Sequence, residues 1–249
     1  MNILSIDTTT KVASVCLKKG NEIFENSIDN KITHSEKLLP LIDDTLKISG
    51  TSLSEIDTFA CINGPGSFTG IRIGLSTLKA FAHVLNKKIF SISTLECMAI
   101  KAFIENTKLD DEDMSSYIST FIDAKNDRVY FSLYKITYLG LDKSINIEKI
   151  TDISNTEINY AFSTSVENFE NITDENIILA GDIIDENKEK LSQLFINHTN
   201  IVLYNYYPNA KDVIKAFSYV SNKDNYIKDA FLLNAEYARL SQAERMKSE

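Results

Sequence analysis

The chain has 249 residues, of which 43% are hydrophobic and 24% charged, with only three prolines, a composition that excludes a disordered or fibrous protein. Its net charge of −9 argues against a large tRNA- or DNA-binding surface, because Lys and Arg supply most of the affinity for phosphate. No apolar run reaches the roughly 18 residues of a membrane span, and the first residues lack the pattern of a signal peptide. We therefore expect a cytoplasmic protein without membrane contact.

The first part of the chain predicts three strands and then alternating helices and strands. The first strand ends at Asp7, a Thr33/Glu36 capping-box pattern opens the first helix, and Gly50 closes it. Pro40 should kink this helix or delay its start. In chain order we expect strands at 2–7, 12–19 and 21–28, a helix at 33–50, a strand at 58–62, a helix ending near 86, a strand at 88–93 and a helix at 94–104.

The same order begins again in the second part of the chain. Residues 106–116 are polar and acidic and predict a hinge or linker. The strand that follows ends in Asp123, turns, and returns, much as the strand ending in Asp7 does. We expect strands at 117–123, 128–136 and 145–150, a helix near 156–169, a strand at 176–181, a helix at 185–197, a strand at 200–204 and a helix from Pro208.

Both parts thus have the order βββαβαβα, which predicts an α/β protein with two RNase-H-like lobes, as in actin, sugar kinases and Hsp70 chaperones. We expect lobes at residues 1–106 and 107–249, with the tail after about 222 packing back on the first lobe. The alternative is an accidental recurrence in an ordinary α/β protein.

In this architecture the turn after the first strand of a lobe holds phosphate, and glycine there lets the backbone approach the anion. Here the turn is "DTTT". The residues that could contact ATP or ADP and its metal-bound water are therefore weak candidates: Asp7, Thr8, Thr9, Asp123 and Gly181. Gly181 stands alone where paired glycines usually contact adenosine. We expect no tightly bound cofactor on the isolated chain, although an ATP-dependent enzyme using Asp7 and Asp123 is the alternative.

The stretch "NGPGSFTGIRIG" from Asn63 is rich in glycine but lacks the lysine and hydroxyl residue of a Walker loop. Gly66, Gly70 and Gly74 recur every four residues, a spacing that places Gly70 and Gly74 on one helix face and permits close helix contact. Arg72, Ser76, Lys79 and His83 form a second, polar stripe on the same helix.

Two helices have more apolar positions than one sheet would cover. On the first helix, Leu39 and Ile48 fall outside the main apolar stripe. On the second, the apolar positions cover most of the circumference. We therefore expect part of this surface to bury against another subunit; the alternative is a central helix enclosed in its own lobe.

Cysteine and histidine residues give no pattern typical of covalent or metal chemistry. The cysteines are odd in number and widely spaced, which favours buried thiols over a disulfide framework or a zinc cluster. The histidines form no metal-ligating pair, and no nucleophile elbow is present in the sequence. We therefore assign no catalytic and no metal-binding residue. The residues concerned are Cys16, Cys61, Cys97, His34, His83 and His198.

Several stretches, "ILSIDTTT", "HSEKLLPLID", "INGPGSFTGIRIGLSTLKAFA", "SISTLE", "DAKNDRVY" and the tail "SQAER", resemble the TsaB family of bacterial tRNA threonylcarbamoyladenosine biosynthesis proteins. The resemblance is dense over residues 1–100 and sparser beyond. It implies an actin-like fold and a non-catalytic subunit that supports a paralogue, TsaD, in transferring threonylcarbamoyl to the adenosine beside the anticodon of tRNAs that read ANN codons. TsaE, an ATPase, is the third member.

The resemblance also implies that TsaD binds through helices at about 34–48 and 69–86. The negative net charge predicts that tRNA contact is indirect, and a homodimer through the same helices when TsaD is absent is a further alternative, because a self-complementary surface can serve both contacts. The expected interface comprises Leu38, Leu41, Ile42, Thr45, Gly70, Ile71, Gly74, Leu75, Leu78, Ala82 and Leu85.

Two departures from the family patterns concern function. The paralogue carries the metal motif HxExH on its first helix, whereas "HSEKL" keeps His34 and Glu36 but has Leu38 at the second ligand, which implies a lost metal site. The same loss argues against the glycoprotease activity once ascribed to the family. Near the end, Tyr237 and Arg239 stand where the family has a Pro-x-Tyr-Leu-Arg segment.

Overall fold

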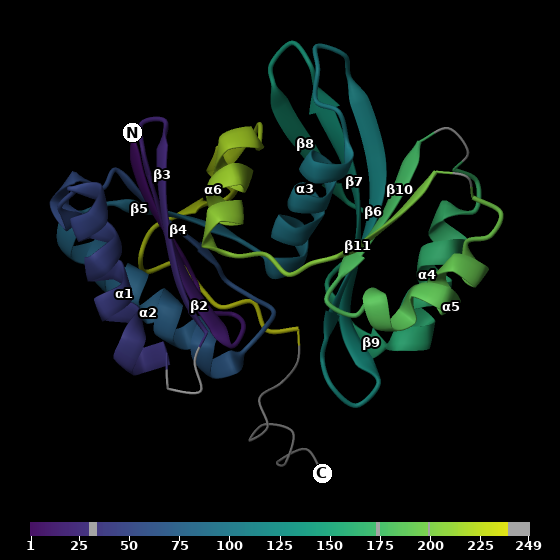
Figure 1. Cartoon of the computed structure of the whole chain (residues 1–249), viewed down its shortest axis with the longest axis horizontal. Coiled ribbons are helices and arrows are strands. Elements are labelled where there is room, and N and C mark those ends of the chain that lie inside the picture. The colour runs from purple at the N-terminus through teal and green to yellow at the C-terminus, as the bar shows by residue number, and fades with distance from the viewer. Residues whose placement is uncertain (30–33, 173–174, 199, 239–249) are drawn as a thin grey trace. The chain divides into compact units, whose positions relative to one another are not determined.

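The structure of the protein is a computed structural model that describes residues 1–29, 34–172, 175–198 and 200–238 (Figure 1). These residues form two compact units. The first unit contains residues 1–94, 208–218 and the segment from Asn222, and the second contains residues 95–207 and 219–221. The limits differ from the single boundary expected after residue 106, because the last helix of each sequence repeat groups with the other unit.

The first unit contains a six-stranded sheet with the order β12-β5-β4-β1-β2-β3. Strands β1, β4 and β5 run parallel, and β2 is antiparallel to β1 and β3. This is the RNase-H-like order predicted from the sequence. The strands are β1 (Asn2–Asp7), β2 (Val12–Lys19), β3 (Glu22–Asp29), β4 (Thr58–Ile62), β5 (Lys88–Ile92) and β12 (Ile227–Lys228), and the helices are α1 (His34–Ser49), α2 (Phe68–Leu85) and most of α6 (Ala210–Tyr219).

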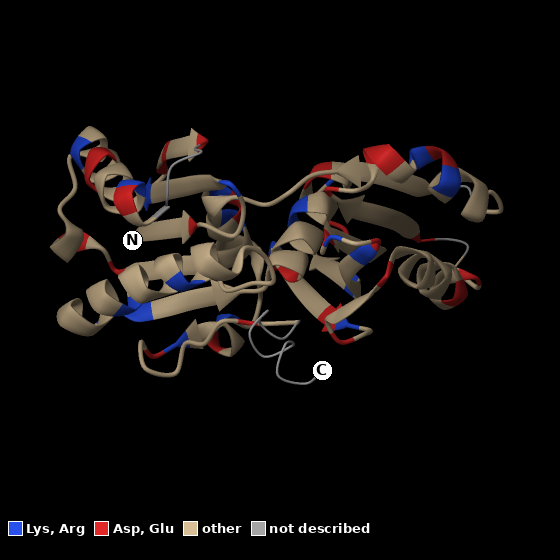
Figure 2. Cartoon of the chain, turned by 90° about the horizontal axis from the view of Figure 1, so that it is seen from below, with Lys and Arg blue, Asp and Glu red and all other residues tan. Residues whose placement is uncertain are grey.

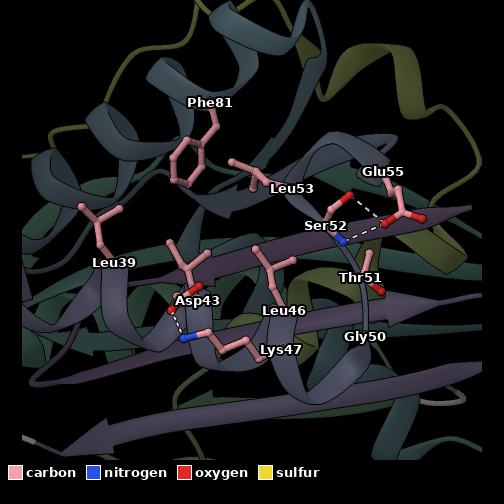
Figure 3. A pocket seen from close by; sticks show the side chains of 11 residues that line it. Leu39, Asp43, Leu46, Lys47, Gly50, Thr51, Ser52, Leu53, Glu55 and Phe81 are labelled. Carbon is pink, nitrogen blue, oxygen red and sulfur yellow. Dashed lines mark hydrogen bonds and ion pairs between the residues drawn. The ribbon is translucent and has the colours of Figure 1, made fainter.

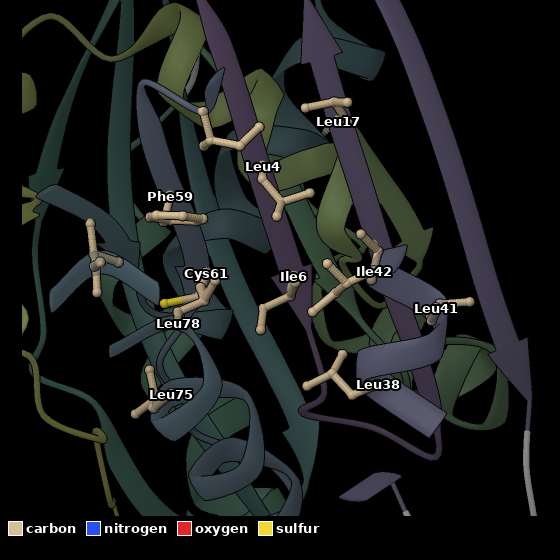
Figure 4. Close-up of a cluster of buried hydrophobic side chains, with 14 of the residues drawn as sticks. Leu4, Ile6, Leu17, Leu38, Leu41, Ile42, Phe59, Cys61, Leu75 and Leu78 are labelled. Atoms are coloured by element: carbon tan, nitrogen blue, oxygen red, sulfur yellow. The ribbon is translucent and has the colours of Figure 1, made fainter. Parts of the chain in front are cut away.

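Side-chain alternation along β1 separates the two faces of this sheet. Leu4 and Ile6 point to the face covered by α1 and α2, where they join a buried apolar cluster (Figure 4). Ser5 points to the opposite face, where its hydroxyl donates to the carbonyl of Ala210 at 2.6 Å and so attaches the start of α6. The helix α1 includes Pro40, so the alternative in which the helix begins after this proline is wrong.

The second unit repeats the plan with the strand order β11-β10-β6-β7-β8, and an additional strand, β9, pairs with β7. Helices α4 and α5 pack with this sheet in a second apolar cluster. The strands are β6 (Met114–Asp123), β7 (Arg128–Leu139), β8 (Ser144–Lys149), β9 (Ser154–Glu157), β10 (Asn176–Gly181) and β11 (Ile201–Asn205), and the helices are α3 (Thr94–Asn106), α4 (Ile158–Phe169) and α5 (Lys188–Leu194).

The predicted order βββαβαβα is confirmed in the first repeat, and the second repeat follows it with one additional strand, β9, before its first helix. Strand β6 begins at Met114, inside the predicted linker, and β9 occupies residues where the fourth helix was expected to begin. The predicted cap at Thr33 lies outside the described residues. Acidic and basic residues are interspersed along the ribbon of both units (Figure 2).

Candidate partner-binding site

Asp7, the first candidate for contact with a nucleotide, ends β1 and is only 2% exposed. Its carboxylate accepts hydrogen bonds from the Thr9 backbone N–H at 3.0 Å and from the Thr9 hydroxyl at 2.6 Å. Burial raises the pKa of Asp7 to about 6, although the bonds from Thr9 oppose the change, and the nearby Asp212 carboxylate adds to it. Asp7 is therefore a buried acid integrated into the core of the first unit.

Thr8 serves to attach helix α2 to the turn after β1. Its hydroxyl donates to the carbonyl of Gly70 at 2.8 Å. A Cβ atom at Gly70 would lie 1.9 Å from the Thr8 carbonyl oxygen, and one at Gly74 would lie 2.4 Å from the Thr8 Oγ1. The glycine spacing therefore permits close packing, as expected, but the surface that approaches is the turn of the same unit and not another helix.

In the second unit, Asp123 and Gly181 also have internal roles. The carboxylate of Asp123 accepts hydrogen bonds from the Lys125 backbone N–H at 2.8 Å and from its side-chain ammonium. A Cβ atom at Gly181 would lie 2.2 Å from the Phe121 carbonyl oxygen, so glycine is needed for the contact between β10 and β6. The hydroxyls of Thr8 and Thr9 in the first unit each have one proton, which they donate to Gly70 and Asp7. A phosphate at Thr8 or Thr9 would therefore have to compete with these hydrogen bonds.

Ten of the eleven residues expected at the partner interface are buried within the first unit, and Leu85 is partly exposed. Leu38, Leu41 and Leu78, for example, are between 0% and 6% exposed and belong to the cluster against the sheet (Figure 4). These side chains cannot form a contact surface while the unit is folded. A strongly apolar stripe on an α/β helix first identifies the face that packs on the sheet, and the burial of these residues follows that rule.

The outward face of α2 carries a different stripe. Ile73, Thr77, Ala80 and Val84 follow one another at intervals of four, three and four residues, so they share one side of the helix. Ile73 and Thr77 are partly exposed, Ala80 is exposed, and Val84 is 79% exposed. We call these four residues the open stripe. The spacing of these four residues can be read from the sequence. The sequence alone does not distinguish them from the apolar positions of the same helix that are buried.

A groove of about 650 Å³ lies between α1, the segment 50–55 and Phe81 of α2 (Figure 3). Leu39, 54% exposed, lies at one end, and Leu46 and Leu53 contribute apolar surface. Asp43 and Lys47 form an ion pair at its edge. Leu39 was expected to require cover outside its own lobe, and the structure leaves it exposed beside α2.

The polar stripe of α2 is covered by a segment near the end of the chain, residues 229–237, which we call the strap. The Arg72 Nε donates to the Tyr237 hydroxyl at 2.9 Å, and the Lys79 Nζ donates to the Leu233 carbonyl at 2.7 Å. The His83 ring lies 4.8 Å from the ring of Phe231. The tail was expected near the first lobe, but its alignment with the polar stripe was not predicted.

The described residues contain no group of three or more His, Cys, Asp or Glu side chains placed to hold a metal ion. The side chain of His34 and the residues Arg239 and 241–245 lie outside the part that the structure describes, so the motif "HSEKL" and the end of the tail are only partly seen. No helix among the described residues is long and apolar enough to cross a membrane.

Two six-stranded sheets of RNase-H-like order define a protein of the actin-like class, and comparisons with known proteins agree. A Pseudomonas aeruginosa protein described as similar to the peptidase YeaZ has the same fold, with a TM-score of 0.69 and 21% identity over 96% of this chain and 99% of that one. A family model described as TsaD, tRNA N6-adenosine threonylcarbamoyltransferase, matches residues 22–244.

Curated relatives are more specific. A tRNA threonylcarbamoyladenosine biosynthesis protein TsaB from Buchnera aphidicola subsp. Schizaphis graminum is 33% identical over 60% of this chain and 71% of its own length. The TsaB protein of Haemophilus influenzae is 34% identical over 53% of each chain, so the chain spans about half the length of that relative. The chain belongs to the TsaB family.

Proposed function

We propose that the chain is a non-catalytic scaffold subunit in the biosynthesis of threonylcarbamoyladenosine in tRNA, and that it binds and supports the transferase subunit TsaD. The observation that carries this proposal is the open stripe on α2 beside the groove of α1. The surface combines exposed apolar side chains with a few polar ones, lies on two long helices, and is separate from the turns where this fold would hold a nucleotide.

The homology to the TsaD family model supports the choice of partner. A paralogue of the same fold has its own pair of helices at the corresponding place. Two related helix pairs can therefore pack face to face around an approximate twofold axis, as the two halves of a symmetric dimer do. In that arrangement the open stripe inserts between the partner's helices, and Leu39 and Phe81 contact their flanks.

A non-catalytic role for this chain is supported by the hydrogen bonds around Asp7. Thr8 and Thr9 donate to Gly70 and Asp7, so the turn is satisfied without phosphate. We assign the transfer step to TsaD, and we expect nucleotide to bind this chain only weakly or with the partner's help. TsaE joins the complex, tRNA contact is indirect, and the site of action is the cytoplasm, where tRNA is modified.

Homodimerisation through the same stripe is expected when TsaD is absent, because a surface that fits a paralogue can also fit a second copy of itself. Sedimentation of the purified chain with and without TsaD measures this directly. Addition of TsaD should convert the homodimer into a heterodimer, and TsaD should not bind to the intact homodimer.

The test of partner binding is Val84→Asp, with Ile196→Asp as the matched control. Val84 is 79% exposed on the stripe, and Ile196 is 77% exposed in the second unit, so neither change should unfold the chain. An unpaired charge in a desolvated contact costs on the order of 3 kcal/mol, which corresponds to roughly 100-fold weaker binding. Leu41 and Leu78 are unsuitable, because a charge there would disrupt the core.

Binding of TsaD is measured by titration calorimetry, and modified adenosine is measured by mass spectrometry of tRNA. We expect Val84→Asp to lose both and Ile196→Asp to keep both. Equal affinity of the two variants would overturn the proposed interface. Modification of tRNA by this chain without TsaD, or micromolar ATP binding lost on Asp7→Ala, would instead favour an enzyme acting through its own residues.

A further inference from the structure

The strap follows α2 over most of the length of the helix, in the opposite direction. Phe231 meets His83, Leu233 meets Lys79, and Tyr237 meets Arg72. Two strap residues, Ala230 and Leu233, are 5% and 1% exposed and belong to the core cluster. The strap is therefore a fixed part of the first unit (Figure 1).

The other sides of α2 face the sheet, through buried residues such as Ile71 and Leu78, the turn after β1, which receives Gly70 and Gly74, and the groove of α1 at Phe81. With the strap in place, the open stripe is the side of the helix that remains for a partner. The strap thus limits which part of α2 another protein can contact.

The first turns of α2 depend strongly on contacts from outside the helix. Gly70 and Gly74 are needed for packing on Thr8, but glycine is a poor helix former. The cap is a single hydrogen bond of 3.2 Å from the Gly70 N–H to the Ser67 hydroxyl. This part of the helix carries Ile73, the first apolar residue of the open stripe.

The end of the strap supplies the contacts that these turns need. The Tyr237 ring lies 4.9 Å from the Phe68 ring, and the Arg72 guanidinium lies 3.8 Å above the same Phe68 ring. One step earlier, the Glu236 N–H donates to the Asn63 carbonyl at 2.8 Å, which fixes the loop before the helix. Together, Phe68, Arg72 and Tyr237 form a contact layer over the first turn, with the two rings tilted by 35°.

We propose that Tyr237 is a positioning residue for partner binding: through Phe68 and Arg72 it keeps the glycine-containing start of α2 helical and so presents Ile73 to TsaD. The inference rests on the proposed function for the identity of the partner. It goes further in assigning a role to the end of the strap, which lies on another side of the helix from the surface that is bound.

The test compares Tyr237→Ala, which removes the ring contact and the hydrogen bond, with Tyr237→Phe, which keeps the ring. Leu232→Ser is the matched control, because Leu232 lies in the same strap with its side chain 71% exposed. Two quantities are measured in the full chain: amide hydrogen exchange of residues 69–75, and the Kd for TsaD well below the melting temperature.

We expect Tyr237→Ala to accelerate exchange of residues 69–75 at least about tenfold and to weaken TsaD binding by a similar factor, since a helix formed only part of the time binds in proportion to its population. Tyr237→Phe should restore most of both quantities, and Leu232→Ser should change neither. A role in stability alone would lower the melting temperature without changing the Kd.

Faster exchange with an unchanged Kd would overturn the positioning role, and unchanged exchange would overturn the contact on which it depends. If the wild-type chain fails to bind TsaD at all, the proposed function is wrong. The exchange measurement then still decides whether Tyr237 holds the start of α2.

Discussion

The turns that end the first strands of the two repeats look alike in sequence but differ in environment. Asp7 is 2% exposed and has its pKa raised to about 6, chiefly by burial. The Asp123 side chain is 35% exposed. Partial burial opposes ionisation there, yet the hydrogen bonds and charge of Lys125 prevail and lower the pKa of Asp123. The same position in the fold thus carries a carboxyl group that resists ionisation in one unit and favours it in the other.

A second pair of residues shows what the two repeats share. Gly70 and Gly181 each permit a close approach to a backbone carbonyl oxygen at the end of the first strand or in its turn, at Thr8 and at Phe121 respectively. In both units the glycine therefore serves internal packing. The difference between the repeats lies in the acidic side chain and its surroundings, not in the backbone that holds it.

The largest effects should come from these glycines. Gly70→Ala and Gly181→Ala would place Cβ atoms 1.9 Å and 2.2 Å from carbonyl oxygens, so the backbone must shift, and we expect a loss of about 3 kcal/mol or more in the free energy of unfolding. Gly20→Ala is the control: its Cβ would meet nothing within 4 Å, and its φ of +59° costs only about 1 kcal/mol. Denaturant titration measures all three. Equal losses would contradict the assigned packing roles.

The next largest effect is on the pH dependence of the free energy of unfolding, in which Asp7 should differ from an exposed carboxyl group. Its folded pKa of about 6 exceeds the unfolded value of 3.8, so the native state holds the proton more tightly. The corresponding stability is fully present below pH 3.8 and is lost as the pH rises to about 6, a change of about 3 kcal/mol. Asp7→Asn, which can still accept from Thr9, should remove this loss.

Unfolding free energies of wild type and Asp7→Asn should be measured from pH 4 to pH 8. The variant should gain relative to wild type as the pH rises, with the difference levelling above pH 6. A variant that is less stable than wild type at pH 8 would show that ionised Asp7 is stabilised by a partner, as a metal-binding role would require.

Much of the fold was predictable because its signals are local. Short apolar strands, capping residues and a restart of the same order at Asp123 predicted both sheets. Strand β9 was missed because "SNTE" is polar throughout and shows no apolar alternation, and it forms by pairing with β7. The sequence did not predict that α3 groups with the second unit and α6 with the first, because this grouping depends on packing and not on the sequence of the helix.

The candidate site was predictable at the level of helices but not of side chains. Periodicity finds the most apolar face of a helix, which here is the face toward the sheet, as for Leu38 and Leu78. The open stripe contains Thr77 and Ala80, a polar and a small residue, so it is less apolar in sequence than the face toward the sheet. The strap contacts Arg72 from a segment 165 residues away, a separation at which sequence patterns carry no pairing signal.

Thr8 offers a smaller test of the first turn. Thr8→Val keeps the shape of the side chain but removes the buried hydrogen bond to the Gly70 carbonyl, which should cost about 1 kcal/mol in the free energy of unfolding. Thr10→Val, at a more exposed hydrogen bond within the same turn, should cost less. If Thr8 instead served phosphate binding, its replacement would leave stability unchanged and reduce nucleotide affinity.

The smallest effect belongs to Asp123, and it should have the opposite sign to that of Asp7. Because the folded pKa lies below the unfolded value, its contribution is present above the unfolded pKa and is lost as the pH falls through the folded one. The side chains of Asp123 and Lys125 are 35% and 80% exposed, so solvent screens the pair and the gain stays below about 1 kcal/mol. Asp123→Asn should therefore be slightly less stable than wild type at pH 7, and the difference should disappear as the pH falls through the lowered folded pKa. Asp7→Asn should be more stable at pH 7, so a common sign for the two variants would mean that both turns have the same environment.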